Sequence, residues 1–366
     1  MRLACLSTDP GIAYGGTKGA AVHLAAIVEA LAAEGNEVLV LVAGMAPGCS
    51  PPPGVSVEVV PGSGKGHSAR ERLDFQDRLA AWLERRLDEF GAHVLCERFA
   101  LHAVAGSTAA RRLGIPHLLE LNAPLLEEAA RYRNLEEPEA AERLERATIS
   151  SADLVFAVSP PLAAYAQARG AARVEVLQNA AAIERFPSRE RNGANPVAVF
   201  AGSLRPWHGI ETIAAAWRLL GSSAPRLLVI GNGPSRELLR GLAATVTGLV
   251  PPERVPTLLA GADIGLAPYS TDASDYFSPM KLFEYLAAGL ATVVADLPAV
   301  TAVVDPDTAV VIPRGDADAL AEAVASLCAD SSERRRLGEN GRALVAAEHT
   351  WRHRARRVLE AAGELA

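Results

Sequence analysis

Short apolar runs alternate with longer amphipathic segments along most of the chain. The runs at 1–7 and 38–42 predict buried strands, and the segment at about 20–34 between them predicts a helix that ends at Gly35. Nearly continuous apolar strands indicate a parallel sheet that is covered on both faces. A strand, a helix and a second strand in this order predict a βαβ unit at the start of the chain.

The alternation continues, is interrupted once and then restarts. In the first half, further strands are predicted at 55–60, 93–96, 117–121, 154–158 and 174–177, and helices at about 70–89, 101–113 and 127–151. In the second half, strands are predicted at 197–201, 226–230, 264–268, 292–295 and 310–312, and helices at about 210–220, 278–289, 316–329, 331–347 and 350–363. The interruption is polar and contains two prolines, as linkers often do. The sequence therefore predicts two successive α/β domains, 1–183 and 197–347, joined by a linker at 184–196.

Length and composition narrow the class of protein. The chain has 366 residues, of which 49% are apolar, so it is long enough for two domains with real cores. The net charge of −7 gives no general attraction to nucleic acid or to anionic lipid. No apolar run reaches membrane-spanning length, and the arginines at 334–336 and 352–357 leave only a weak peripheral membrane contact open.

The four cysteines lie far apart in the sequence. Cys5, Cys49, Cys96 and Cys328 do not have the spacing of a metal-ligand motif, and no His/Glu helix pair indicates zinc. The first residues run directly into a strand and lack a signal-peptide cleavage region. We therefore expect a cytoplasmic protein with reduced cysteines.

The segment 277–289 carries the clearest chemical signal. Ser278 is a favourable N-cap, Pro279 fits the first helical position, and Gly289 can end the helix in a left-handed conformation. The helix is apolar almost all round, which predicts burial, yet it carries Lys281 and Glu284 on one face. A helix N-terminus accompanied by a lysine favours an anion. The alternative is a structural Lys–Glu pair in an ordinary core helix.

Polar residues gather where the predicted strands end, and ligands bind at that edge in open α/β sheets. They are Gly15, Gly16, Glu97, Arg98, Glu120, Asn122 and Ser159 in the first half, and Arg205, His208, Gly231, Asn232 and Gly233 in the second. The glycines do not form the Gly-x-Gly-x-x-Gly fingerprint, which argues against a nicotinamide or flavin enzyme. The pairs Glu97–Arg98 and Glu120–Asn122 are equally consistent with structural roles.

Four segments of the second half, in order, are similar to family 4 glycosyltransferases. They are 202–209, 229–234, 262–269 and 278–289, and the Gly15–Gly16 loop and 177–179 resemble landmarks of the family's first domain. The resemblance implies a GT-B fold, with two Rossmann-like domains facing each other across a cleft and the C-terminal helix, about 348–366, packed back on the first domain. It also implies transfer of a sugar from a nucleoside-diphosphate sugar with retention of configuration, without a metal ion or other cofactor.

The resemblance also implies roles for single residues. Glu284 would bind the ribose hydroxyls of the donor, and the helix start would face its diphosphate. The implied donor-binding residues are Gly15, Gly16, Gly231, Gly233, Ser278, Pro279, Met280 and Glu284. The implied catalytic residues are Lys281, Arg205, His208 and Asn122. The candidates for contacts to the acceptor or to the transferred sugar are Glu97, Arg98, Glu120 and Tyr276.

The chain departs from the family pattern at several of these positions. Tyr276 stands where the family has a first acid, Ser203 where it has an arginine, and His208 where it has a lysine. Asn122 replaces a histidine at a strand end of the first domain. If a bound phosphate keeps His208 protonated, activity is expected to fall at high pH.

The sequence therefore favours a cytoplasmic glycosyltransferase whose acceptor is held by the first domain and is a small molecule, a natural product or a glycan precursor. A sugar-nucleotide epimerase of the same architecture and a non-catalytic nucleotide-sugar-binding partner protein remain as alternatives. The donor base, the sugar and the acceptor are not specified by these residues.

Overall fold

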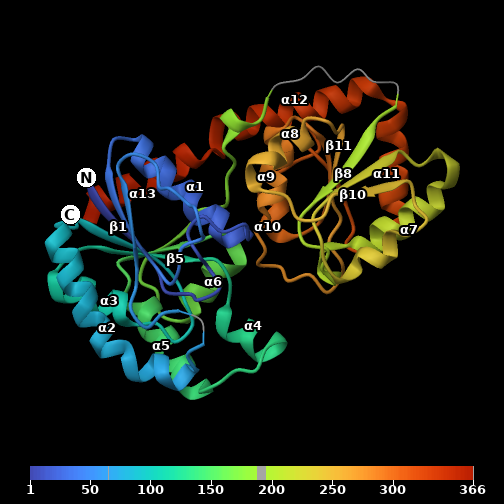
Figure 1. Cartoon of the computed structure of the whole chain (residues 1–366). Helices are drawn as coiled ribbons and strands as arrows, with labels where there is room; N and C mark the ends of the chain where they lie inside the picture. Colours follow the sequence, from blue (N-terminus) through green and yellow to red (C-terminus); the bar gives the residue numbers. More distant parts are fainter. Residues whose placement is uncertain (65, 188–194, 366) are drawn as a thin grey trace. The chain divides into compact units, whose positions relative to one another are not determined.

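The computed structural model describes residues 1–64, 66–187 and 195–365, which form two compact α/β units (Figure 1). Unit 1 contains Met1–Gln178 and Trp351–Ala366, and unit 2 contains Asn179–Thr350. The chain thus passes from unit 1 to unit 2 after Gln178, five residues before the predicted domain end at 183. Of the predicted linker, residues 188–194 lie outside the described residues.

Unit 1 is built on a seven-stranded parallel sheet with the order β3-β2-β1-β4-β5-β6-β7. Its strands are β1 Arg2–Ser7, β2 Glu37–Val42, β3 Val55–Val59, β4 Val94–Arg98, β5 His117–Leu121, β6 Leu154–Ala157 and β7 Val174–Val176. Its helices are α1 Gly19–Ala33, α2 Ala69–Phe90, α3 Ala105–Leu113, α4 Leu125–Tyr132, α5 Pro138–Ser151, α6 Pro160–Ala168 and α13 Trp351–Leu365.

Helices bury both faces of this sheet, as the apolar strands predict. Successive residues of β1 alternate between two cores: Leu3 and Cys5 face one, and Ala4 and Leu6 face the other. Helices α1 and α13 pack together on the first face, and α2 packs with α3 on the other. Helix α13 therefore completes a core that the first half of the chain begins.

Unit 2 has a six-stranded parallel sheet with the order β10-β9-β8-β11-β12-β13. Its strands are β8 Val197–Ala201, β9 Arg226–Ile230, β10 Ala244–Val246, β11 Ile264–Ala267, β12 Ala291–Ala295 and β13 Val310–Ile312. Its α-helices are α7 Ile210–Leu220, α8 Val255–Leu259, α9 Met280–Ala287, α10 Pro298–Thr301, α11 Ala317–Ala329 and α12 Ser331–Glu348. Short 3₁₀ turns include η2 Pro206–His208 and η4 Pro234–Leu239.

Two predicted helices of the first half are wrong in extent. The segment 127–151 forms two helices, α4 and α5, because Pro138 has no N–H to continue a helix and instead starts one, after Glu137 in a left-handed conformation with φ 50°. The helix predicted at 101–113 begins only at Ala105, because His102 also has a left-handed backbone, with φ 65°. Both differences follow from backbone angles that side-chain periodicity does not report.

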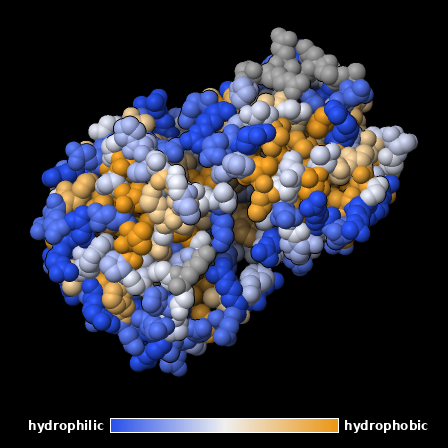
Figure 2. Space-filling model, viewed as in Figure 1, coloured by the Kyte–Doolittle hydropathy of each residue, from blue (hydrophilic) through white to orange (hydrophobic). Residues whose placement is uncertain are grey.

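The surface is mainly polar. Figure 2 shows charged and polar residues over much of the visible face of each unit, with apolar residues in smaller patches. Among the described residues, no helix combines the length and the apolar character needed to cross a bilayer.

Candidate functional site

The sheet of unit 2 has a topological switch point between β8 and β11. The chain adds β9 and β10 on one side of β8, and β12 and β13 on the other side of β11. The loops that follow β8 and β11 therefore leave the same edge in diverging directions, and ligands bind at such points in open α/β sheets. The loop after β11 leads into helix α9, the helix of the 277–289 segment.

The loops after β8 and β9 are joined by backbone contacts that only glycine permits. The N–H of Gly202 donates to the carbonyl of Ile230 at 2.9 Å, and the N–H of Leu204 donates to the carbonyl of Asn232 at 3.0 Å. Gly231 has φ 144°, and a Cβ there would collide with the carbonyl of Gly202; a Cβ at Gly233 would lie 2.7 Å from the carbonyl oxygen of Leu204. The glycines predicted as donor-binding residues therefore hold two loops against each other.

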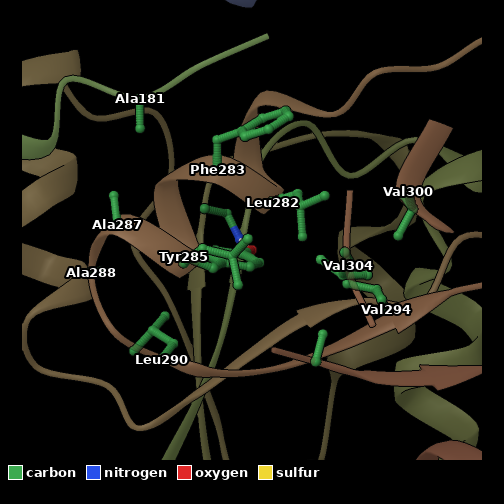
Figure 3. Close-up of a cluster of buried hydrophobic side chains, with 14 of the residues drawn as sticks. Ala181, Leu282, Phe283, Tyr285, Ala287, Ala288, Leu290, Val294, Val300 and Val304 are labelled. Carbon is green, nitrogen blue, oxygen red and sulfur yellow. The ribbon is translucent and has the colours of Figure 1, made fainter. Parts of the chain in front are cut away.

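Helix α9 is enclosed by apolar side chains. Leu282, Phe283 and Tyr285 project from it in different directions into one buried cluster, which Val294 of β12 joins (Figure 3). The hydroxyl of Tyr285 accepts a hydrogen bond from the backbone N–H of Ala201 at 2.6 Å. A Cβ at Gly265 would lie 2.7 Å from the Tyr285 ring. The helix is thus fixed against the ends of β8 and β11.

The predicted cap of this helix is wrong. Helix α9 begins at Met280 with Pro279 in the N-cap position, and no side chain caps it. The hydroxyl of Ser278 instead accepts from the backbone N–H of Asn179 at 3.3 Å, and the Asn179 amide donates to the carbonyl of Ser278 at 2.6 Å. Because these contacts use Ser278, the first N–H groups of the helix keep their capacity to bind an anion.

Lys281 is buried among aromatic rings at this helix start. It is 8% exposed, and its Nζ lies 4.1 Å from the centroid of the Phe200 ring and 5.4 Å from that of Tyr269. Within the described residues, Nζ has no hydrogen-bond partner. A Cβ at Gly202 would lie 3.1 Å from Nζ, so the ammonium group sits beside the glycine loop that follows β8. A buried ammonium group without an acceptor is costly, which favours a missing anionic partner.

Burial shifts the pKa values of Lys281 and Glu284 toward each other. It lowers the pKa of Lys281 to about 7, partly opposed by the charge of Glu284. It raises the pKa of Glu284 to about 7, partly opposed by the charge of Lys281. The two do not form a direct ion pair within the described residues, and Glu284 is partly exposed while its neighbours on the helix are buried. These observations favour a Glu284 carboxylate that is open to a ligand over a structural Lys281–Glu284 pair.

His208 belongs to the same cluster, and Arg205 lies at its rim. The ring centroid of His208 lies 5.8 Å from that of Tyr269 and 6.2 Å from that of Phe200. Burial lowers the pKa of His208 to about 3, and the positive charges of Lys281 and Arg205 act in the same direction. A hydrogen bond to the carbonyl of Ser203 favours the charged form and opposes this shift only in part. In the free protein His208 is therefore neutral. Arg205 is exposed, with its guanidinium 5.8 Å from the centroid of the Trp207 ring.

Tyr276 lies in the loop between β11 and α9. Its ring centroid is 4.9 Å from that of Phe277, whose ring stacks on Tyr269. The family pattern has an acid at position 276, where this chain has tyrosine. The neighbouring Asp275 accepts a hydrogen bond from Arg314 at 2.7 Å, so this acid is already held by an arginine.

The predicted residues of unit 1 fall into separate groups. Gly15 and Gly16 lie in the loop between β1 and α1, where Gly15 has φ 75° and a Cβ would collide with Cys49. Glu97 is buried and pairs with His117, its carboxylate 2.9 Å from Nε2. This geometry favours the structural role for Glu97.

Glu120 forms a second polar group in unit 1. Its carboxylate lies 2.5 Å from His23 Nε2 and 3.4 Å from a guanidinium nitrogen of Arg98. Burial would raise the pKa of Glu120, but His23, Arg98 and the amide of Asn122 favour the carboxylate more, and the pKa falls to about 2. No sequence motif connects His23 to this group, because His23 lies on α1, far from β5 in the chain.

The structure thus gathers Lys281, Glu284, His208, Gly202 and the paired glycine loops at one edge of the unit 2 sheet. Phe200, Tyr269 and Tyr285 complete this site, and sequence analysis missed them because ordinary core aromatic residues carry no motif. Glu97, Arg98, Glu120 and Asn122 are in unit 1, at the ends of β4 and β5.

Comparison with known proteins shows which family each half of the chain matches. Residues 18–180 match the family model described as "Glycosyl transferase 4-like domain", and residues 195–330 match that described as "Glycosyl transferases group 1". No curated protein matches the chain.

Solved structures share the fold over the full length. Sucrose-phosphate synthase from Thermosynechococcus elongatus has a TM-score of 0.78 at 19% identity, covering 100% of this chain and 99% of its own. HepE from Anabaena, in complex with UDP, has a TM-score of 0.75 at 14% identity, covering 100% of both chains. A putative UDP-N-acetylglucosamine 2-epimerase from Listeria monocytogenes has a TM-score of 0.65 at 14% identity, covering 98% of this chain and 94% of its own. These structural neighbours include GT-B glycosyltransferases, and the chain belongs to the group 1, family 4-like glycosyltransferases.

Proposed function

We propose that this glycosyltransferase uses a nucleoside-diphosphate sugar and transfers the sugar with retention of configuration and without a metal ion. The observation that carries the proposal is the buried Lys281 ammonium group, without a hydrogen-bond partner in the described residues, beside the glycine loop after β8. A diphosphate would supply the negative charge that this group lacks. HepE, which shares the fold, was solved with UDP.

The donor is proposed to lie across the β8–β11 edge of unit 2. Its diphosphate would face Lys281 and the uncapped start of α9, and the ribose hydroxyls would donate to the partly exposed carboxylate of Glu284. Positive charge and helix N–H groups would then stabilise the departing diphosphate, the role that a metal ion has in other transferases. His208 and Arg205 are proposed to bind the same leaving group.

The acceptor is proposed to be held by unit 1.

All four cysteines are free thiols in the structure, which fits a reaction in the reducing cytoplasm.

A thermal-shift panel of UDP, GDP, ADP and TDP tests the donor site, because a ligand that binds the folded state raises its stability by mass action. We expect one of the four to raise the melting temperature clearly more than the others. No shift with any of them would contradict the proposal.

The role of Glu284 is tested by Glu284→Ala, with Glu211→Ala at an exposed position of α7 as the matched control. Loss of a charge-assisted contact to the ribose should weaken binding of the selected nucleotide by about tenfold to a hundredfold. The control should bind as the wild type does. Equal binding by Glu284→Ala would remove the ribose assignment and leave the donor site in place.

Reaction products separate transfer from the two alternatives. Incubation with the selected nucleotide sugar alone should leave the sugar unchanged in configuration, whereas an epimerase would form a new sugar nucleotide. With an acceptor panel, the nucleoside diphosphate should be released together with a glycosylated product. Donor binding without turnover on any acceptor would favour the non-catalytic alternative.

A further inference from the structure

Helix α9 does not start where its own sequence favours a start. Serine is a good N-cap and proline fits the first helical position, so Ser278 and Pro279 favour a helix that is capped by Ser278. In the structure Pro279 has an extended backbone, with φ −77° and ψ 116°, and occupies the N-cap position itself. A contact from outside the helix must therefore stabilise the later start.

Ser278 would need two of its groups to act as the N-cap. Its carbonyl would accept from the backbone N–H of Leu282, four residues further along the chain. Its hydroxyl would accept from the backbone N–H of Met280 or Lys281. In the structure the N–H of Leu282 donates to the carbonyl of Pro279 instead, at 3.1 Å.

Asn179 occupies both of these groups of Ser278. Its side-chain amide donates to the Ser278 carbonyl at 2.6 Å, and its backbone N–H donates to the Ser278 hydroxyl at 3.3 Å. Asn179 is only 6% exposed, so water competes little for these bonds. One residue thus takes up both the carbonyl and the hydroxyl that the favoured cap requires.

The segment that carries Asn179 is itself fixed against α9. Asn179 is the first residue of unit 2, and two residues later Ala181 forms a parallel bridge with Thr350. The N–H of Ala181 donates to the carbonyl of His349 at 3.0 Å. The ring centroid of His349 lies 5.2 Å from that of Phe283 on α9. Asn179 is therefore presented to Ser278 by a segment that is anchored on the same helix.

These contacts decide how many N–H groups remain open at the start of α9. If Ser278 capped the helix, its hydroxyl would take one of the first N–H groups, and fewer would remain for an anion. Lys281 lies at the same end of the helix, and its buried Nζ has no hydrogen-bond partner within the described residues. By holding Ser278, Asn179 keeps the N–H groups available next to this ammonium group.

We propose that Asn179 is a positioning residue for the donor diphosphate, because it holds Ser278 away from the start of α9 and keeps that start open. The inference rests on the proposed function, since it assumes that the diphosphate binds at this helix start. Asn179 itself touches no substrate. Without its amide, Ser278 caps the helix in most molecules, and the nucleotide has to displace this cap before it binds.

Calorimetry on the full-length protein tests the proposal, with the nucleoside diphosphate that the thermal-shift panel selects. Asn179→Ala should weaken binding about three- to tenfold, because only molecules with an open helix start bind and a serine cap favours the closed start. Asn36→Ala is the matched control, since the buried amide of Asn36 donates to the carbonyl of Leu31 at 2.9 Å in unit 1. The control should bind as the wild type does, and an equal weakening by both variants would overturn the proposal.

The same substitution in a Ser278→Ala background separates this mechanism from a structural role. The Ser278 carbonyl belongs to the backbone, so a structural bond from Asn179 is present in both backgrounds and its loss should weaken binding by the same factor in each. A competing cap requires the Ser278 hydroxyl. Asn179→Ala should therefore weaken binding by less than about twofold when Ser278 is already alanine. The same factor in both backgrounds would overturn the proposal.

Thermal melting checks that each variant folds. Should Asn179→Ala not fold, Asn179→Asp replaces it, because aspartate keeps the shape of the side chain without the N–H. Its added charge is common to both backgrounds, so the comparison of the two factors is unaffected. If the wild type binds the nucleotide and Asn179→Ala binds equally well, the inference fails alone. If the wild type binds none of the four nucleotides, the proposed function fails instead.

Discussion

The hydroxyl of Tyr285 accepts a hydrogen bond from the backbone N–H of Ala201 and so ties helix α9 to the end of strand β8. Tyr285→Phe would leave that N–H buried without a partner. We expect it to lower the free energy of unfolding by about 1–3 kcal/mol, measured by urea denaturation.

Tyr269→Phe is the control for this change, because it removes the same hydroxyl from another buried tyrosine, for which the described residues offer no hydrogen bond. Tyr269→Phe should lower the free energy of unfolding by less than about 0.5 kcal/mol. An equal loss in both variants would show that the bond to Ala201 does not hold the helix.

Gly231→Ala is expected to destabilise unit 2, because the new Cβ would collide with the carbonyl of Gly202. Gly241→Ala is the matched control: its φ of 74° is also positive, but no atom lies within 4 Å of the added Cβ. The control should lower the free energy of unfolding by about 1 kcal/mol, from backbone strain alone. Gly231→Ala should lower it by at least about 2 kcal/mol more. Thermal melting compares the two, and similar melting temperatures would contradict the steric argument.

Glu284→Gln is expected to change how stability depends on pH. Burial raises the folded-state pKa of Glu284 from 4.5 to about 7, so the folded wild type holds a proton that the unfolded chain releases between these values. The stability of the wild type relative to Glu284→Gln therefore falls as the pH rises from about 4.5 to about 7. In melting experiments without ligand, we compare the free energy of unfolding of Glu284→Gln with that of the wild type. The advantage of the variant in this free energy should be larger at pH 8 than at pH 5, by about 1 kcal/mol or more. An advantage that is the same at both pH values would mean that the carboxyl group is not perturbed.

Binding of the nucleoside diphosphate that the thermal-shift panel selects is expected to take up a proton at pH 8. Lys281 has a pKa of about 7 in the free protein, and a bound diphosphate raises that pKa, so the neutral amine gains a proton. Calorimetry in two buffers of different ionisation enthalpy measures the uptake. The pKa of His208 would have to rise much further, from about 3, for the ring to become charged. His208→Gln should therefore keep the proton uptake, whereas Lys281→Met, at a saturating concentration of the selected nucleotide, should lose it. The reverse pattern would assign the proton to His208.

The α/β class was predictable from sequence because it depends on the period of the apolar residues. The family was predictable because it depends on the spacing of motif residues along the chain. The apolar runs located β1, β2 and β8, and the 277–289 segment located α9. What escaped prediction depends on single backbone angles. The break at Pro138 and the late start of α3 follow from left-handed Glu137 and His102, which no apolar pattern marks.

The site was predictable to the extent that it lies on motifs. Lys281 and Glu284 were found as charges on an apolar helix, and the glycines as residues at strand ends. The pairing of His23 with Glu120 arises only when distant segments meet, so one sequence does not reveal it.

Helix α13 completes the core of unit 1, although it follows all of unit 2 in the chain. During synthesis, the ribosome therefore makes every residue of unit 2 before it makes the last helix of unit 1. Until then, the part of the unit 1 sheet and the side of helix α1 that α13 covers stay exposed, while unit 2 has all of its strands. Translation order thus favours unit 2 as the first to reach its final structure.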